Sequence, residues 1–184
     1  MRKAENLAWV LPRPKPDYYK GGFPLWFEER LLKLYGLDYK SHDLKDVVLQ
    51  MFAGTTKYGF RVDINPDVHP DLVADCHALP EEWTNKFFLT ITDPPYNDQL
   101  SEELYGTRHV RYQTYIKEAV RCTQENGYIA SYHWVMTPNP EGTALHRRIF
   151  VGTRAWHHPR VCMVFKKLDA KTARRQELRR LLQS

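Results

Sequence analysis

Cysteine and long hydrophobic runs are scarce in this sequence, and each shortage excludes a class of protein. The three cysteines among 184 residues, Cys76, Cys122 and Cys162, are scattered and odd in number. None belongs to a CxxC pair or to a Cys/His cluster with zinc-ligand spacing, so we expect reduced thiols and no bound metal. No apolar stretch approaches the roughly 20 residues that a membrane-spanning helix needs.

Internal repeats, linkers and a secretory signal are also missing. The basic N-terminal segment contains an apolar run too short for a signal peptide, and we expect a cytoplasmic protein of a bacterial, archaeal or phage-infected cell. The length suits a single domain, 1–184, with residues 1–20 as an extended N-terminal arm and residues 168–184 as a basic C-terminal helix. Hydrophobic residues at 42% and charged residues at 27% are typical of a globular protein, and the net charge of +5 suits a polyanionic partner.

Short apolar or β-branched runs alternate with two helical patterns. Residues 23–36 and 112–127 carry apolar side chains at helical spacing, and the second pattern closes with Asn-Gly. Continuously apolar runs indicate a mostly parallel sheet covered on both faces, hence an α/β fold in which the last two strands form an antiparallel pair. The seven runs that predict strands are 46–52, 59–64, 71–75, 87–93, 128–134, 147–153 and 160–167.

The connections after the first two predicted strands are unusually short. Residues 53–58 separate the first strand from the second, and residues 65–70 separate the second from the third. Parallel neighbours usually need a crossover of about a dozen residues, so we expect both crossover helices to be reduced to a turn or a single helical turn. The face left thinly covered would be sealed by the N-terminal arm, by the C-terminal helix or by a second subunit.

A glycine and three acidic residues follow the first four predicted strands. In open parallel sheets ligands bind at the carboxyl ends of the strands, so a ligand is expected there. A carboxylate after the second strand suits the two hydroxyls of a ribose, and one after the third suits an adenine amino group. The residues are Gly54 after the first strand, Asp63 and Asn65 after the second, Asp75, Cys76 and His77 after the third, and Asp93 after the fourth.

Taken together, these motifs resemble class I S-adenosylmethionine-dependent methyltransferases of the amino-methyltransferase type, which carry (D/N/S)PP(Y/F/W). The similarity spans residues 21–167 and depends on DPPY (93–96) being in register with FAG, DINP and AD. It implies a Rossmann-like sheet of seven strands ending in an antiparallel hairpin, with S-adenosyl-L-methionine as cofactor. By this resemblance the cofactor-binding residues are Gly21, Gly22, Phe23, Phe52, Gly54, Thr55, Asp63, Asn65, Asp75, Cys76 and His77.

The DPPY motif suits the methylation of an exocyclic amine. Such an amine is a poor nucleophile because its lone pair is delocalised into the base. The Asp93 carboxylate and the Pro94 carbonyl can each accept one N–H and so direct the lone pair at the methyl group. Pro95 stiffens the turn, and Tyr96 would stack on the base. We therefore assign Asp93, Pro94, Pro95 and Tyr96 as the catalytic motif.

Two further segments are expected to contact substrate. His133 and Trp134 end the fifth strand on the same rim, although core packing explains them equally well. Arg108 and Arg111 lie in a basic and aromatic segment that could reach phosphates, or that could be an ordinary surface loop. Little of the chain remains for target recognition, so a short or relaxed recognition sequence is expected.

Methyl transfer to adenine N6 in DNA is the leading hypothesis, because DPPY is usual in the adenine enzymes of this family. Cytosine N4 in DNA and a base amino group in rRNA are the alternatives, and a degenerate fold that only binds nucleic acid is the non-enzymatic one. A homodimer is possible. The basic tail could follow a phosphate backbone, although a solvated helix face is the simpler explanation. Its basic residues are Lys171, Arg174, Arg175, Arg179 and Arg180.

Overall fold

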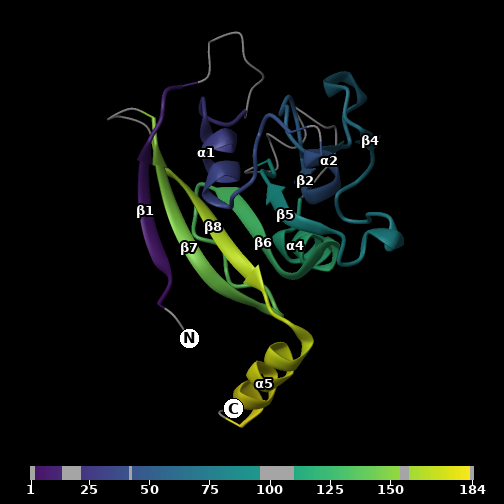
Figure 1. Ribbon diagram of the computed structural model, residues 1–184, viewed down its shortest axis with the longest axis vertical. Helices are drawn as coiled ribbons and strands as arrows, with labels where there is room; N and C mark the ends of the chain where they lie inside the picture. Colours follow the sequence, from purple (N-terminus) through teal and green to yellow (C-terminus); the bar gives the residue numbers. More distant parts are fainter. Residues whose placement is uncertain (1–2, 14–21, 42, 96–109, 154–157, 183–184) are drawn as a thin grey trace.

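An eight-stranded sheet forms the centre of the molecule, with its strands in the order β1-β7-β8-β6-β5-β2-β3-β4 (Figure 1). This computed structural model describes residues 3–13, 22–41, 43–95, 110–153 and 158–182. The strands are β1 (Glu5–Val10), β2 (Val48–Met51), β3 (Phe60–Asp63), β4 (Leu72–Val73), β5 (Phe87–Thr92), β6 (Thr123–His133), β7 (Thr143–Gly152) and β8 (Arg160–Lys167). The helices are α1 (Phe27–Leu34), α2 (Leu44–Val47), α4 (Tyr112–Cys122) and α5 (Ala170–Leu181), with short 3-10 helices η1 (Pro66–Val68) and η2 (Glu81–Trp83).

The strand order is that of the Rossmann-like class I methyltransferase fold predicted from the sequence. Neighbouring strands pair in parallel, except that β8 is antiparallel to both β6 and β7. The predicted antiparallel pair is therefore β7 and β8. The N-terminal arm differs from the prediction, because Glu5–Val10 is an edge strand of the sheet and pairs in parallel with β7.

Two hydrophobic clusters cover the two faces of the sheet. On one face, Phe27 and Leu31 of α1 are one helical turn apart and fully buried, together with Trp9 of β1. On the other face, Tyr115 and Ala119 of α4 are buried at the same spacing. These two helices provide the cover that a parallel sheet requires on both sides.

The second predicted helix ends earlier than its Asn-Gly sequence indicated. α4 ends at Cys122, and the chain passes directly into β6, which contains Asn126 and Gly127. A Cβ atom at Gly127 would lie 2.6 Å from the Phe88 carbonyl oxygen, so two backbone segments approach there as only glycine permits. The Asn-Gly pair therefore marks an irregularity within a strand, and the expected helix end at Gly127 is wrong.

Both short crossovers are as reduced as the sequence predicted. Residues 52–59 join β2 to β3, and residues 64–71, which include η1, join β3 to β4. Trp83 of η2 packs on this part of the sheet, edge-on to Phe60 and Phe87 at centroid distances of 5.1 and 5.5 Å. β1 lies at the opposite edge of the sheet and α5 projects away from it (Figure 1). Neither the described part of the N-terminal arm, residues 3–13, nor α5 therefore covers this region.

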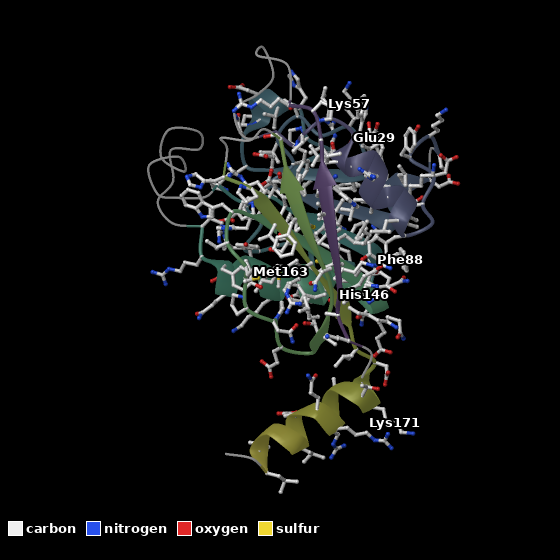
Figure 2. The ribbon with its side chains drawn as sticks, turned by 90° about the vertical axis from the view of Figure 1, so that its left-hand side faces the viewer. Glu29, Lys57, Phe88, His146, Met163 and Lys171 are labelled. Atoms are coloured by element: carbon white, nitrogen blue, oxygen red, sulfur yellow. The ribbon has the colours of Figure 1, made fainter. Side chains whose placement is uncertain are left out.

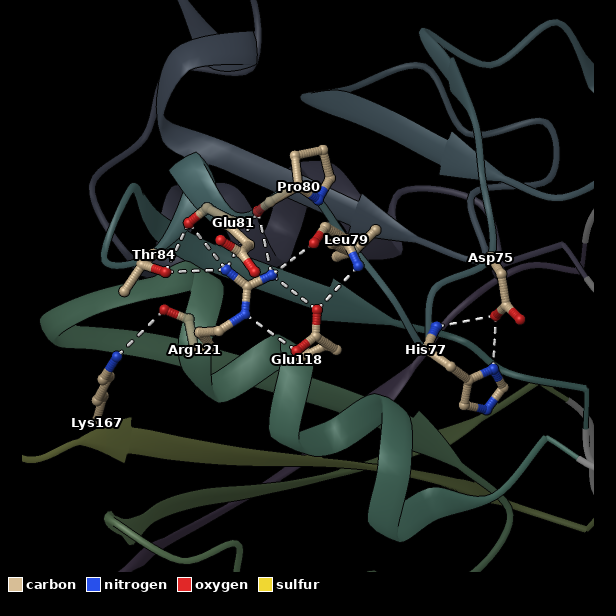
Figure 3. A network of polar contacts seen from close by, with 9 residues as sticks. All are labelled: Asp75, His77, Leu79, Pro80, Glu81, Thr84, Glu118, Arg121 and Lys167. Carbon is tan, nitrogen blue, oxygen red and sulfur yellow. Dashed lines mark hydrogen bonds and ion pairs between the residues drawn. The ribbon is translucent and has the colours of Figure 1, made fainter.

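Arg121 of α4 holds the loop that carries Trp83. Glu118 completes the arrangement, because its carboxylate also accepts the Leu79 N–H at 2.9 Å. A single guanidinium thus donates to three successive backbone carbonyls, two of which, those of Pro80 and Glu81, also accept backbone N–H groups of η2. Its acceptors are the Leu79, Pro80 and Glu81 carbonyl oxygens, Thr84 Oγ1 and the Glu118 carboxylate (Figure 3).

Candidate cofactor and substrate site

Most of the predicted site residues that the structure describes follow strands that end at one edge of the sheet. β4, β3, β2, β5 and β6 are adjacent and parallel, so their carboxyl ends meet there. Met51 pairs with Thr92, and Thr92 pairs with Ser131, so β2, β5 and β6 end at one level. Open parallel sheets bind ligands at this position.

Part of the predicted glycine-rich entry lies in the core. Phe23 is buried, and its ring stacks on Phe27 at 4.9 Å and meets Tyr132 edge-on at 5.2 Å. Gly22 beside it is half-buried. Phe23 therefore supports the edge of the sheet through its ring contact with Tyr132 of β6. Three predicted residues, Gly21, Tyr96 and Arg108, lie outside the described residues.

The loop after β2 closes around the Asp63 carboxylate. Asp63 Oδ2 accepts the Gly54 N–H at 2.7 Å, and Oδ1 accepts the Asn65 N–H at 2.9 Å. Asp63 is buried, which raises the pKa of its carboxyl, while these backbone N–H groups act in the opposite direction. Gly54 has a φ of 49°, a region that favours glycine, and Thr55 beside it is half-buried. Asp63 thus organises the glycine loop, and a ribose would have to use its remaining lone pairs.

An exposed carboxylate and aromatic rings lie beyond β2 and β4. Phe52 has a φ of 58°, which is uncommon outside glycine, and its N–H donates to the Sγ atom of buried Cys76 at 3.3 Å. Its ring meets Tyr115 edge-on at 5.2 Å and His77 at 6.5 Å. Asp75 is exposed, and its Oδ1 atom accepts the His77 N–H and lies 2.6 Å from His77 Nδ1 (Figure 3). Flat rings beside a hydrogen-bond acceptor suit a purine with an amino group.

Asp93 follows the central strand β5 at the middle of the edge. It is half-buried, as is Pro95, and Pro94 between them is buried. Burial and then the Asp93 charge raise the pKa of the Tyr132 hydroxyl, and Asp93 acts in the same direction on Tyr115. The acidic start of the DPPY motif therefore lies among aromatic side chains from both faces of the sheet.

Glu28 of α1 is an acidic residue of this site that the sequence analysis missed. Its Oε1 atom accepts a hydrogen bond of 2.8 Å from Gln50 Nε2, and Gln50 is buried within β2. Burial, then the charges of Glu29 and Asp93, raise the pKa of Glu28 to about 8. Glu28 is thus mostly protonated at neutral pH. The available signal was Gln50, because a polar side chain inside an apolar strand needs a buried partner.

Two hydroxyl groups next to Asp93 were also missed. Thr92 and Ser131 are fully buried at paired positions of β5 and β6. Within the described ranges, neither Thr92 Oγ1 nor Ser131 Oγ has a hydrogen-bond partner of normal geometry. Both residues looked like ordinary strand positions in the sequence, and only the pairing of the strands brings them together.

The candidate substrate residues lie on the same rim. His133 is half-buried at the end of β6, where burial and the Arg160 charge lower its pKa, and its Nδ1 atom accepts the Val135 N–H. Trp134 is 46% exposed, as a base-stacking residue would need to be. Arg111 immediately precedes α4 and is exposed. The Tyr112 hydroxyl next to it donates to the Pro138 carbonyl at 2.6 Å, which joins α4 to the loop after β6.

Among the described residues, no group of three or more His, Cys, Asp or Glu side chains has metal-binding geometry. In the same part of the chain, no helix combines the length and apolarity needed to cross a membrane.

Comparisons with known proteins leave the family of this chain unassigned. No family model and no curated protein sequence matches it. Of the solved structures, the antibiotic-resistance methyltransferase Kmr aligns over 87% of this chain and 100% of its own, with 12% identity and a TM-score of 0.43. The aminoglycoside resistance methyltransferase NpmB1 aligns over 52% of this chain and 59% of its own, with 12% identity and a TM-score of 0.35. Such distant likenesses carry no argument, and the fold assignment depends on the strand order.

Proposed function

We propose that this protein transfers a methyl group from S-adenosyl-L-methionine to an exocyclic amino group of a nucleobase, with adenine N6 in DNA as the leading substrate. One observation carries the proposal. The Asp93-Pro94-Pro95 segment follows the central strand at the same edge where Gly54, Asp63 and Asp75 follow its neighbours. The residues proposed to hold the amine thus follow a strand next to those whose ends carry the residues proposed to bind the nucleoside.

The residues at this edge fit the proposed cofactor. The exposed Asp75 carboxylate, with the Phe52 and His77 rings beside it, would take the adenine and its amino group. Gly54 brings backbone close to the ligand, and Asp63 holds that loop in place. Thr55 and Asn65 border the same loop. Gly22, Phe23 and Cys76 also belong to the proposed cofactor-binding set, as does Gly21, which lies outside the described residues.

The reaction needs alignment more than it needs a strong base. The bound cofactor supplies a methyl carbon made electrophilic by its sulfonium. The Asp93 carboxylate and the Pro94 carbonyl oxygen accept the two N–H groups of the amine and so turn its lone pair toward that carbon. Attack by the amine nitrogen would form the N–C bond, and the cofactor's sulfur would keep the electron pair of the C–S bond that breaks. The surplus proton then passes from nitrogen to Asp93 or to water.

The substrate is proposed to reach this edge as a base turned out of its stack. Tyr96 and Trp134 would stack on the base, and His133 would line its slot. Arg108 and Arg111 would contact neighbouring phosphates. Cytosine N4 and amino groups of rRNA bases offer the same chemistry, so the assay must separate them.

Labelled methyl transfer, followed by nucleoside mass spectrometry, tests the proposal. The purified chain is incubated with cofactor and, in separate reactions, duplex DNA, rRNA and protein. We expect N6-methyladenine in DNA. The Asp93→Ala variant should lose transfer by about 100-fold or more while still binding cofactor, because it removes one of the two groups that position the amine. The matched control is Asp46→Ala, an exposed acid on α2.

The outcomes separate the hypotheses. Label found only in RNA would replace the DNA substrate, and N4-methylcytosine would replace adenine. No calorimetric binding at millimolar cofactor would favour the inert nucleic-acid-binding module. An Asp93→Ala variant with activity close to that of Asp46→Ala would remove the proposed role of the motif.

A further inference from the structure

The C-terminal helix α5 stands apart from the rest of the molecule. Figures 1 and 2 show it below the sheet, continuing from the end of β8 and covering no face of the core. Asp169 caps its start by accepting the Thr172 N–H at 2.9 Å, and the Ala170 N–H donates to Glu125 at 3.3 Å. Its described side chains are exposed, apart from the half-buried Ala173 and Gln176. Packing of the core therefore does not explain this helix.

Nearly all charged residues of α5 are basic. One acid, Glu177, accompanies the five basic residues that the sequence places in the helix. Lys171 and Arg175 are four residues apart, so they share one face of the helix at a spacing of about 6 Å. Like charges at this spacing repel one another and oppose an isolated helix, which at this length is marginal in water. A polyanion would remove that repulsion.

The position of α5 separates it from the proposed active site. β8 is antiparallel to β6, and Met163 pairs with Ser131 at the level of the catalytic edge. The chain then runs through Lys167 to the opposite end of the sheet before α5 begins at Ala170. The segment from Met163 to Ala170, in extended conformation, covers roughly 20 Å, and the length of α5 adds about 18 Å. A ligand that touches both places has to be long.

We propose that α5 binds the phosphate backbone of duplex DNA. The contact would lie about 20 Å or more from the base that enters the proposed active site. At 3.4 Å per base-pair step, this distance is at least about six base pairs. The inference depends on the proposed function for its choice of DNA, and it adds a second, remote contact to the same substrate. A second copy of the chain is the competing occupant, because Leu178 and Leu181 are 53% and 67% exposed. Charge favours DNA, since two copies of α5 would bring their basic residues together.

Binding measured without cofactor tests this contact independently of methyl transfer. The triple variant Lys171→Gln, Arg174→Gln, Arg175→Gln is compared with Lys33→Gln, Lys40→Gln, Lys117→Gln, whose residues are exposed on other elements. Each set removes three charges and lowers the net charge from +5 to +2, because 5 − 3 = 2. Fluorescence anisotropy against salt is recorded for a duplex of about 40 base pairs and for one of about 10, which extends roughly 17 Å to each side of a central target.

On the long duplex, we expect the slope of log K against the logarithm of the salt concentration to be smaller in magnitude by about 2 to 3 for the α5 variant. Its binding should also be at least about 10-fold weaker. The slope of the control variant should stay within about 0.5 of the natural protein's slope. On the short duplex the two variants should match. Equal slopes for both variants on the long duplex, or equal losses on the two duplexes, would overturn the proposal. So would an α5-dependent gain for RNA alone, or a dimer in sedimentation that the α5 changes dissociate. If α5 behaves as expected but no methyl transfer occurs, the proposed function fails and this contact remains.

Discussion

Glu28 shows how a single buried interaction changes the charge of the candidate site. Its carboxyl accepts a hydrogen bond from Gln50. Burial raises its pKa, the negative charges of Glu29 and Asp93 raise it further, and the positive charge of Lys57 lowers it. A protonated Glu28 lessens the negative charge around Asp93 at this edge of the sheet. The Glu29 carboxylate is engaged separately, because it accepts the Tyr58 hydroxyl at 2.7 Å.

Glu28 should make the stability of the protein depend on pH. Its pKa is about 8 in the folded chain and 4.5 as the ordinary value, so the folded state holds a proton that the unfolded state has lost. Its contribution to the free energy of unfolding therefore falls as the pH rises from about 4.5 to about 8, and is constant above that. Glu28→Gln keeps the acceptor for Gln50 and should be more stable than the natural protein at pH 8 by about 1–3 kcal/mol, less than the full shift implies because water reaches this half-buried group.

Urea unfolding at several pH values measures this difference. Glu82→Gln, an exposed acid on η2, serves as the control and should leave the pH dependence unchanged. A Glu28→Gln curve parallel to that of the natural protein between pH 5 and 8 would show that Glu28 is ionised in the fold.

At the scale of elements, the loop before β5 replaces a crossover helix by side-chain interactions. A helix satisfies its own backbone groups, whereas this irregular loop needs partners for its carbonyls. The Arg121 guanidinium of α4 donates to these carbonyls. At the end of α4, Lys167 of β8 donates in the same way to the Val120 and Thr123 carbonyls, at 2.7 Å each. The compact fold thus depends on two long basic side chains.

Arg121→Ala should destabilise the protein by about 2–3 kcal/mol, because it removes the guanidinium that donates to the Leu79 carbonyl and to the Glu118 carboxylate. Hydrogen exchange should accelerate in residues 79–84 before it does so elsewhere. Lys117→Ala changes an exposed residue of the same helix and should stay within about 0.5 kcal/mol of the natural stability. Equal stabilities for the two variants would mean that the loop holds itself.

At the scale of the whole molecule, the two terminal segments play opposite parts. β1 completes the sheet, and Trp9 within it is buried, meets Phe27 edge-on at 5.9 Å and lies under the Arg30 guanidinium. α5 leaves the sheet at the end farther from the candidate site and adds charge without adding to the core. The N-terminal strand therefore contributes to stability, whereas the proposed role of α5 is contact with DNA.

Changes at the two ends should separate these roles. Trp9→Ala should cost about 3–5 kcal/mol, because it empties a large buried site. A chain that stops after Leu168 should unfold within about 0.5 kcal/mol of the full chain, with a similar dependence on urea, since little buried surface is removed. Urea denaturation followed by tryptophan fluorescence measures both. A large loss of stability in the shortened chain would show that α5 packs on the body in solution.

Sequence patterns predicted the fold best where local sequence determines the secondary structure, and least well where contacts with distant segments determine it. The apolar runs that contain β2, β5 and β8 form strands whose side chains are mostly buried on both faces of the sheet. Glu5–Val10 was not recognised as a strand, because its exposed pattern reflects an edge position that depends on β7. The Asn-Gly pair at 126–127 misled for a similar reason, since the approach of Phe88 comes from another strand.

The sequence by itself determined which residues follow each strand, and therefore which chemical groups meet at the edge that carries the candidate site. Gly54, Asp63, Asp75 and Asp93 follow from reading along the chain, because a parallel sheet brings the ends of its strands together. Only the tertiary structure decided how these residues are used: Asp63 turned inward to hold the glycine loop, and Glu28 came to lie beside Gln50 and near Asp93. Burial and hydrogen bonding depend on segments distant in the chain, and a linear pattern does not contain them.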